Sequence, residues 1–297
     1  MTEERSDRGE HRCCSNPECN FTAIFDTDFC WLHCFDQDNY RKKIQSLVRQ
    51  KYNLTNANFT GCDFSGLNLG GMVASGAILR YTDLRRTNLS ASFLVGSDLS
   101  GARLIETQLD KSNLRDAILD GAKGEMISAV SADFSQSRGS HCRLIKSDFR
   151  DAKFNSAAWN SCDLSECNLA GVSGLRWQVA FSDFSDSILK EANCEMALMG
   201  GSGLDGVDAS DASFLRANLV GVSAKNASFR NSKFYYARLT SGCFEGADFS
   251  VADLTRSVLR NAILVNANME GSIKDRAIFD RARMAVFSQD SGLIDDH

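Results

Sequence analysis

The stretch Ala57-Asn-Phe-Thr-Gly61 carries the pattern that decides the fold, and it recurs as Ala117-Ile-Leu-Asp-Gly121 and Ala247-Asp-Phe-Ser-Val251. Each copy has a small residue followed, two positions later, by a large apolar centre. From Leu54 to Met284 the pattern stays in register through 47 pentapeptides, of which 33 have Leu or Phe at the centre. In 42 of them the residue two positions before the centre is Ala, Ser, Cys, Thr, Gly or Val. A large and a small side chain are therefore expected to face inward in each repeat.

A period of five excludes long helices and flat strands over this region, because their side chains return to one face every 3.6 and 2 residues. The backbone must instead turn a corner in each repeat. On this pattern the chain resembles the pentapeptide-repeat family from Tyr52 to about Val286. The resemblance implies an all-β solenoid, a right-handed quadrilateral β-helix with four pentapeptides per coil. Nearly twelve coils follow, each rising about 4.8 Å.

Each central side chain of such a coil is expected to stack on the one 20 residues later. Three phenylalanine pairs at this spacing predict aromatic ladders in the core: Phe134 with Phe154, Phe214 with Phe234, and Phe229 with Phe249. Five cysteines of the repeats fall at inward positions, where they serve as small apolar filler. These cysteines are Cys62, Cys142, Cys162, Cys167 and Cys194.

The sequence divides into a Cys-rich segment at 1–35, a capping helix at 36–51, the solenoid at 52–286 and a tail at 287–297. A helix over the first coil is expected because the end of a β-helix exposes its core and edge backbone. Asp36 or Asp38 is its predicted N-cap, and its apolar residues at helical spacing are Tyr40, Ile44, Leu47 and Val48. Its basic residues form either a solvated outer face or a site for an anionic partner. At the other end, Val286 and Phe287 are expected to give partial cover.

The first 35 residues contain a pattern typical of a metal site. Cys14-x4-Cys19 is followed, ten residues later, by Cys30-x2-His33, so two short knuckles present three thiolates and an imidazole. This set predicts a structural zinc ion, because the protein fills all four positions and leaves none open for catalysis. Cys13 or Cys34 could replace a neighbouring ligand. The alternatives are buried thiols without a metal and a redox-active pair.

Charge is distributed unevenly along the solenoid. The net charge is −7 over 160–212 and +5 over 213–286. The acidic band of the first region consists of Asp163, Glu166, Asp183, Asp186, Glu191, Asp205, Asp208 and Asp211. Trp177 lies in the same region, at a position where only a small residue fits. We therefore expect either a local loop or an indole exposed on the surface as an interface anchor.

A column of cationic and larger side chains is predicted two positions after the centres, at 20-residue spacing. Its members are Arg176, Met196, Arg216, Tyr236, Arg256 and Arg276. Neighbours in the column lie about 4.8 Å apart if the coils stack as expected. Like charges at that distance repel unless an anionic group lies along them, so the column is a candidate docking stripe. A chance column of solvated side chains is the alternative.

Composition excludes several classes of function. The net charge of −5 does not indicate a particular partner. The sequence contains no run of about 18 apolar residues that could span a bilayer. The polar N-terminus lacks the apolar stretch of a secretory signal. A reducing cytosol is therefore the expected compartment, and eleven cysteines need not form disulfides there. The sequence has no Gly-rich phosphate loop and no Ser or Cys nucleophile with a nearby His. Neither an enzyme activity nor a small-molecule substrate is expected.

Two functions remain. The first is a non-catalytic interaction scaffold that presents a rigid rod to a protein partner. The second is a DNA mimic that binds and protects a type II topoisomerase such as DNA gyrase, as some members of the resembled family do. The acidic band favours mimicry, whereas the neutral solenoid, the basic last third and the lack of long loops and of a C-terminal dimerisation helix oppose it. Nucleic-acid binding through the column and delivery as a bacterial effector are further alternatives.

Overall fold

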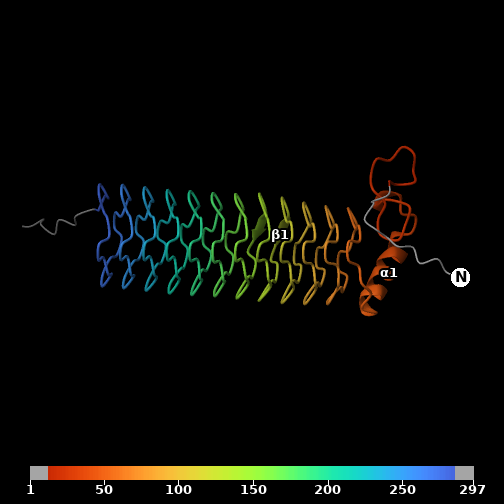
Figure 1. Cartoon of the computed structure of the whole chain (residues 1–297), viewed down its shortest axis with the longest axis horizontal. Coiled ribbons are helices and arrows are strands. Elements are labelled where there is room, and N and C mark those ends of the chain that lie inside the picture. Colours follow the sequence, from red (N-terminus) through yellow and green to blue (C-terminus); the bar gives the residue numbers. More distant parts are fainter. Residues whose placement is uncertain (1–12, 285–297) are drawn as a thin grey trace, which may run out of the picture.

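The computed structural model describes residues 13–284 and shows a narrow rod of stacked coils, with α1 and the segment before it at one end (Figure 1). The named elements are the 3-10 helix η1 (Trp31–His33), α1 (Gln37–Arg49), β1 (Lys123–Glu125) and β2 (Arg143–Ile145). Within the described range, no helix has the length and apolar character needed to cross a membrane.

Parallel backbone pairing between residues 20 apart holds the rod together. The ladder runs from Asn53 paired with Val73 to Ile263 paired with Arg283, and β1 and β2 are a slightly longer stretch of the same ladder. Because each repeat has five residues, this offset corresponds to four pentapeptides per coil. The Asp or Asn before a centre caps the next turn, as when Asp63 Oδ1 accepts a 2.8 Å hydrogen bond from the Ser65 N–H.

The predicted aromatic ladders are confirmed. Their rings are buried and stack with centroids 5.0–5.2 Å apart and interplanar angles of 4–23°. The pairs are Phe134 with Phe154, Phe214 with Phe234, and Phe229 with Phe249. Cys62, Cys142, Cys162, Cys167 and Cys194 are also buried, as expected of core filler.

The predicted exposure of Trp177 is wrong. Its side chain is fully buried and stacks on Phe154, with ring centroids 4.5 Å apart and an interplanar angle of 15°. Space for the indole comes from Gly174, where a Cβ atom would lie only 3.1 Å from Trp177 Cε3. The large and small inward positions have exchanged roles here, so the core stays filled without a loop. Gly124 and Ile127 show the same exchange.

The two ends of the described rod differ. Asp36 caps α1 by accepting a 2.9 Å hydrogen bond from the Asn39 N–H, and Tyr40, Ile44 and Val48 of α1 are buried in one core with the first coils. At the other end, Met284 is 48% exposed. Val286 and Phe287, which were expected to give cover there, lie outside the described residues.

Candidate functional site

Short turns bring the four predicted metal ligands together. The Cys14 N–H bonds to the Phe21 carbonyl at 2.8 Å, and the Cys19 N–H closes a tight turn on Asn16 at 3.0 Å. The helix η1 then carries His33 back over Cys30, whose carbonyl accepts the His33 N–H at 3.1 Å. Two short knuckles therefore bring their ligand side chains together at one point.

The ligand atoms of Cys14, Cys19, Cys30 and His33 all lie within 4.8 Å of one another, close enough to bind one metal ion. His33 Nδ1 is 3.4 Å from both Cys14 Sγ and Cys30 Sγ, and Cys19 Sγ is 3.7 Å from Cys30 Sγ. Tetrahedral zinc with ordinary bond lengths separates two sulfurs by about 3.8 Å and a sulfur and a nitrogen by about 3.6 Å. The spacing of the side chains fits that geometry.

The protonation of Cys14 also suits a metal. Burial raises the pKa of the Cys14 thiol, but hydrogen bonds from backbone groups of Cys30 and Asn16 and the contact with His33 outweigh burial, and the pKa falls to about 6. A thiolate, the form that binds metals, is therefore available at neutral pH. The other ring nitrogen of His33 lies 3.0 Å from the Asn16 side-chain amide, which helps to orient the ring. Within residues 13–284, neither Cys13 nor Cys34 belongs to this group.

Asn58 anchors the Cys/His segment to the first coil, a role that sequence analysis missed. Its side-chain Nδ2 donates to the Ala23 carbonyl at 2.6 Å, and its backbone carbonyl accepts a hydrogen bond from the Phe25 N–H at 2.6 Å. Tyr40 of α1 donates to the Phe25 carbonyl at 2.9 Å. Asn58 occupies an ordinary Asn position of the repeat, so its sequence gave no signal of this second contact.

The predicted column lies along one corner of the rod. All six members have a left-handed backbone with φ between 54° and 59°, and they occupy equivalent corner positions: Arg176, Met196, Arg216, Tyr236, Arg256 and Arg276. Trp177, for which the sequence predicts a loop or an exposed interface anchor, is in the core instead. The column is therefore available to a partner, and the indole is not.

Tyr236 is the centre of a part of the column whose side chains contact one another. The guanidinium carbons of Arg216 and Arg256 lie 5.9 Å and 5.3 Å from its ring centroid, within the range of cation–π contacts. Arg256 also donates a hydrogen bond to the Tyr236 hydroxyl, which lowers the pKa of Tyr236. The Tyr235 ring meets Tyr236 edge-on at 4.5 Å. Tyr236 remains 39% exposed, so the arrangement is open to solvent.

The acidic band differs from the column because many of its carboxylates already have partners. Asp163 pairs with Arg143 at 3.3 Å and Glu166 with Lys146 at 3.9 Å. Asp183 and Asp208 accept hydrogen bonds from backbone N–H groups two residues later, at 2.9 Å and 3.0 Å. These carboxylates stabilise turns as well as carrying charge.

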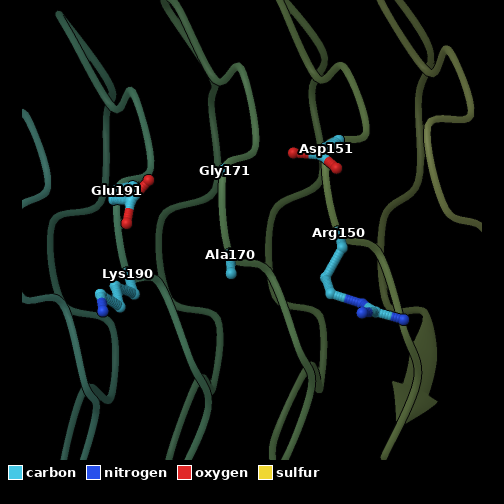
Figure 2. Close-up of a pocket in the computed structure, with 6 residues that line it drawn as sticks. All are labelled: Arg150, Asp151, Ala170, Gly171, Lys190 and Glu191. Atoms are coloured by element: carbon cyan, nitrogen blue, oxygen red, sulfur yellow. The ribbon is translucent and has the colours of Figure 1, made fainter.

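A shallow open notch interrupts the side of the rod beside the acidic band. Figure 2 shows Gly171 and Ala170 between larger side chains of the neighbouring coils, with Asp151 and Arg150 on one side and Lys190 and Glu191 on the other. The notch results from the small size of its two middle residues. Both charge signs line it, so it does not select for one class of ligand.

The repeats of the rod match a known family model over much of their length. A family model described as pentapeptide repeats matches residues 53–90, 82–121, 212–250, 244–273 and 252–284, with eight copies. The unmatched stretch, 122–211, contains the Gly174 and Trp177 exchange, yet the ladder continues through it. No curated protein matches the chain significantly.

Several solved structures are similar to the chain. HetL, a pentapeptide repeat protein involved in heterocyst differentiation regulation in the cyanobacterium Nostoc, is 24% identical, with 82% of this chain and 95% of HetL covered and a TM-score of 0.34. QnrB1, a plasmid-mediated fluoroquinolone resistance protein, is 14% identical over 63% of this chain and 93% of its own, with a TM-score of 0.29. A thylakoid-lumen protein of Arabidopsis thaliana is 28% identical over 29% of this chain and 56% of its own, with a TM-score of 0.24. With its five matched segments and a ladder offset of four pentapeptides, the chain belongs to the pentapeptide-repeat family.

Proposed function

We propose that the protein is a non-catalytic, cytoplasmic interaction scaffold: a rod of about twelve coils, covered at its first coil by α1, that presents its side to a protein partner. The observation that carries this proposal is the exposed Tyr236 between Arg216 and Arg256. Tyr and Arg are the residue types that contribute most to binding energy at protein interfaces. Since the coils fix their spacing, little conformational freedom is lost when a partner binds.

We further propose that Cys14, Cys19, Cys30 and His33 bind a structural zinc ion. The fit of the interatomic distances to tetrahedral coordination supports the assignment. The segment around these residues has few buried apolar groups, and a segment of this size ordinarily needs a metal or disulfides to fold. In the scaffold, the zinc would hold a small module against the first coil and leave the column free.

The scaffold proposal is tested by affinity capture from nuclease-treated native cytosol with mass spectrometry. Wild-type protein is compared with the Arg216→Glu/Arg256→Glu variant. Lys111→Glu/Lys123→Glu is the matched control, because it changes the net charge equally and Lys111 occupies a corner of the same left-handed conformation. We expect one partner to be captured by the wild type and the control and lost from the column variant. Capture that is unchanged in the column variant would remove the column as the docking surface.

A second candidate is the DNA mimic that protects a type II topoisomerase. The stacking of acidic residues in successive coils favours it. Asp163 and Asp183, for example, are neighbours in the parallel backbone ladder. The test changes Asp183, Asp186, Asp208 and Asp211 to Asn, which removes charge but keeps the side-chain acceptors of the turns. Mimicry predicts that the variant loses protection of the topoisomerase from its inhibitor. Absence of protection by the wild type, or full protection by the variant, would contradict mimicry.

A further inference from the structure

The strongest unassigned feature is a patch of cations around Tyr236. We call it the corner patch, and it consists of Arg216, Lys233, Tyr235, Tyr236, Arg238 and Arg256. Backbone pairing sets its layout: Lys233 and Arg238 flank Tyr236 within one coil, while Arg216 and Arg256 come from the coils before and after. The Arg216 N–H bonds to the Tyr235 carbonyl at 2.9 Å, and the Tyr236 N–H to the Thr255 carbonyl at 3.1 Å.

The cations of the corner patch lack the carboxylate partners found earlier in the rod. Arg85 pairs with Asp83 at 2.7 Å, and Arg138 pairs with Asp120 at 2.8 Å. By contrast, no carboxylate of residues 13–284 lies within 4.0 Å of the charged nitrogens of the patch. Asp253, the ladder neighbour of Lys233, instead accepts the Thr255 N–H at 2.9 Å.

The geometry around Tyr236 prepares guanidinium groups for an anion. The ring lies between Arg216 and Arg256, and the hydrogen bond from Arg256 to the hydroxyl restrains that side chain before any ligand arrives. A guanidinium has five N–H donors in a planar fork that matches a carboxylate. One hydrogen bond to Tyr236 leaves further donors of Arg256 for a ligand.

We propose that the corner patch binds a short acidic segment of the partner protein, an extended stretch containing several Asp or Glu residues. This inference rests on the proposed scaffold function and names the chemistry of its partner. The three coils of the patch span about 10 Å, the reach of a few extended residues. A nucleic acid lying along the rod would pass from the patch onto the region 160–212, whose net charge is −7. Charge therefore favours a short acidic peptide over a long polyanion.

The test measures binding of fluorescent probes to the full-length protein by anisotropy. The probes are a ten-residue peptide alternating Glu and Asp with Gly and Ser, the same peptide with Gln and Asn, and a twelve-nucleotide single-stranded DNA. Protein variants are Arg216→Gln/Arg256→Gln and Tyr236→Ala, with Lys111→Gln/Lys123→Gln as the control. Circular dichroism of each variant verifies that the rod is folded.

We expect the acidic peptide to bind in a salt-dependent manner and more tightly than the other two probes. The arginine variant should weaken this binding by at least about tenfold, since charge-assisted hydrogen bonds are lost, and the control should leave it unchanged. Equal binding of the neutral peptide, tighter binding of DNA, or unchanged binding by the arginine variant would overturn the inference. If the acidic peptide does not bind while cytosolic capture still depends on Arg216 and Arg256, the peptide assignment fails and the scaffold proposal stands.

Discussion

The Cys/His module at 13–35 and the solenoid at 53–284 are stabilised in different ways. In the solenoid, backbone pairing with the next coil repeats every 20 residues, and central side chains such as Leu84 and Phe154 are fully buried. In the module, Phe21, Leu32 and Phe35 are 59%, 71% and 105% exposed, and the ligand atoms of the cluster are its main point of convergence. Repetition gives the solenoid a core of its own, whereas the module buries few apolar residues, and two of these, Ile24 and Trp31, lie in a core shared with α1 and the first coils.

The largest effect is expected from loss of a zinc ligand, which should unfold the module and leave the solenoid folded. We expect Cys30→Ser to abolish stoichiometric zinc binding and unfold the module, because structural zinc contributes about 10–16 kcal/mol to the folding of small zinc-finger peptides. The solenoid should keep its thermal transition. Metal content and limited proteolysis measure the two outcomes, and Cys13→Ser is the control because Cys13 lies outside the cluster. Full zinc content in the Cys30→Ser protein would contradict the assignment.

Within the solenoid, the next largest effect is expected at the exchanged pair. Trp177→Ala should destabilise the rod by about 3–5 kcal/mol, since it leaves a cavity where the indole was buried. Adding Gly174→Leu should recover part of this loss, because it restores a large centre and a small neighbour. Urea unfolding of the wild type, the two single variants Trp177→Ala and Gly174→Leu, and the double variant measures the coupling. Strict additivity of the two substitutions would show that Gly174 and Trp177 do not share one space.

A smaller contrast is expected between two buried indoles. Trp177 Nε1 has no hydrogen-bond partner among the described residues, whereas Trp159 Nε1 donates to Ser137 Oγ at 2.9 Å. Trp177→Phe should therefore cost about 1 kcal/mol less than Trp159→Phe, because only the second substitution removes a made hydrogen bond. The midpoints of urea unfolding compare them. A larger loss for Trp177→Phe would indicate that its N–H is satisfied in solution.

The smallest effect is a pH dependence of the solenoid. Burial raises the pKa of Asp98, but hydrogen bonds from Ser100 and Arg80 and the charge of Arg80 outweigh burial, so the pKa is lowered. A carboxyl group with a lowered pKa stabilises the folded state above its unfolded pKa of about 3.9 and loses that contribution as the pH falls through the folded pKa. Asp98→Asn should therefore flatten the fall in melting temperature below about pH 4. The same slope in Asp98→Asn and in the exposed control Asp116→Asn would refute this contribution.

Much of the solenoid could be predicted from its sequence because the same contacts recur. The period of five and the 20-residue stacking of Phe134 on Phe154 are properties of a regular pattern. The placement of Trp177 could not be predicted from that pattern, since it depends on the volume left by Gly174 three residues earlier. The ligand set Cys14, Cys19, Cys30 and His33 followed from spacing, because local turns decide which thiols meet. The anchoring contacts of Asn58 depend on docking between separate segments, which a local pattern does not encode.

Hydrogen–deuterium exchange of the full-length protein, before and after zinc chelation, tests most directly the claim that a self-sufficient rod carries a metal-dependent module. Chelation should raise exchange in residues 13–35, including the amides of Cys14 and Ile24 that are hydrogen-bonded in the folded module. Amides of the ladder from Leu54 to Arg283 should stay protected. Loss of protection throughout the ladder, or unchanged exchange in the module, would contradict the account.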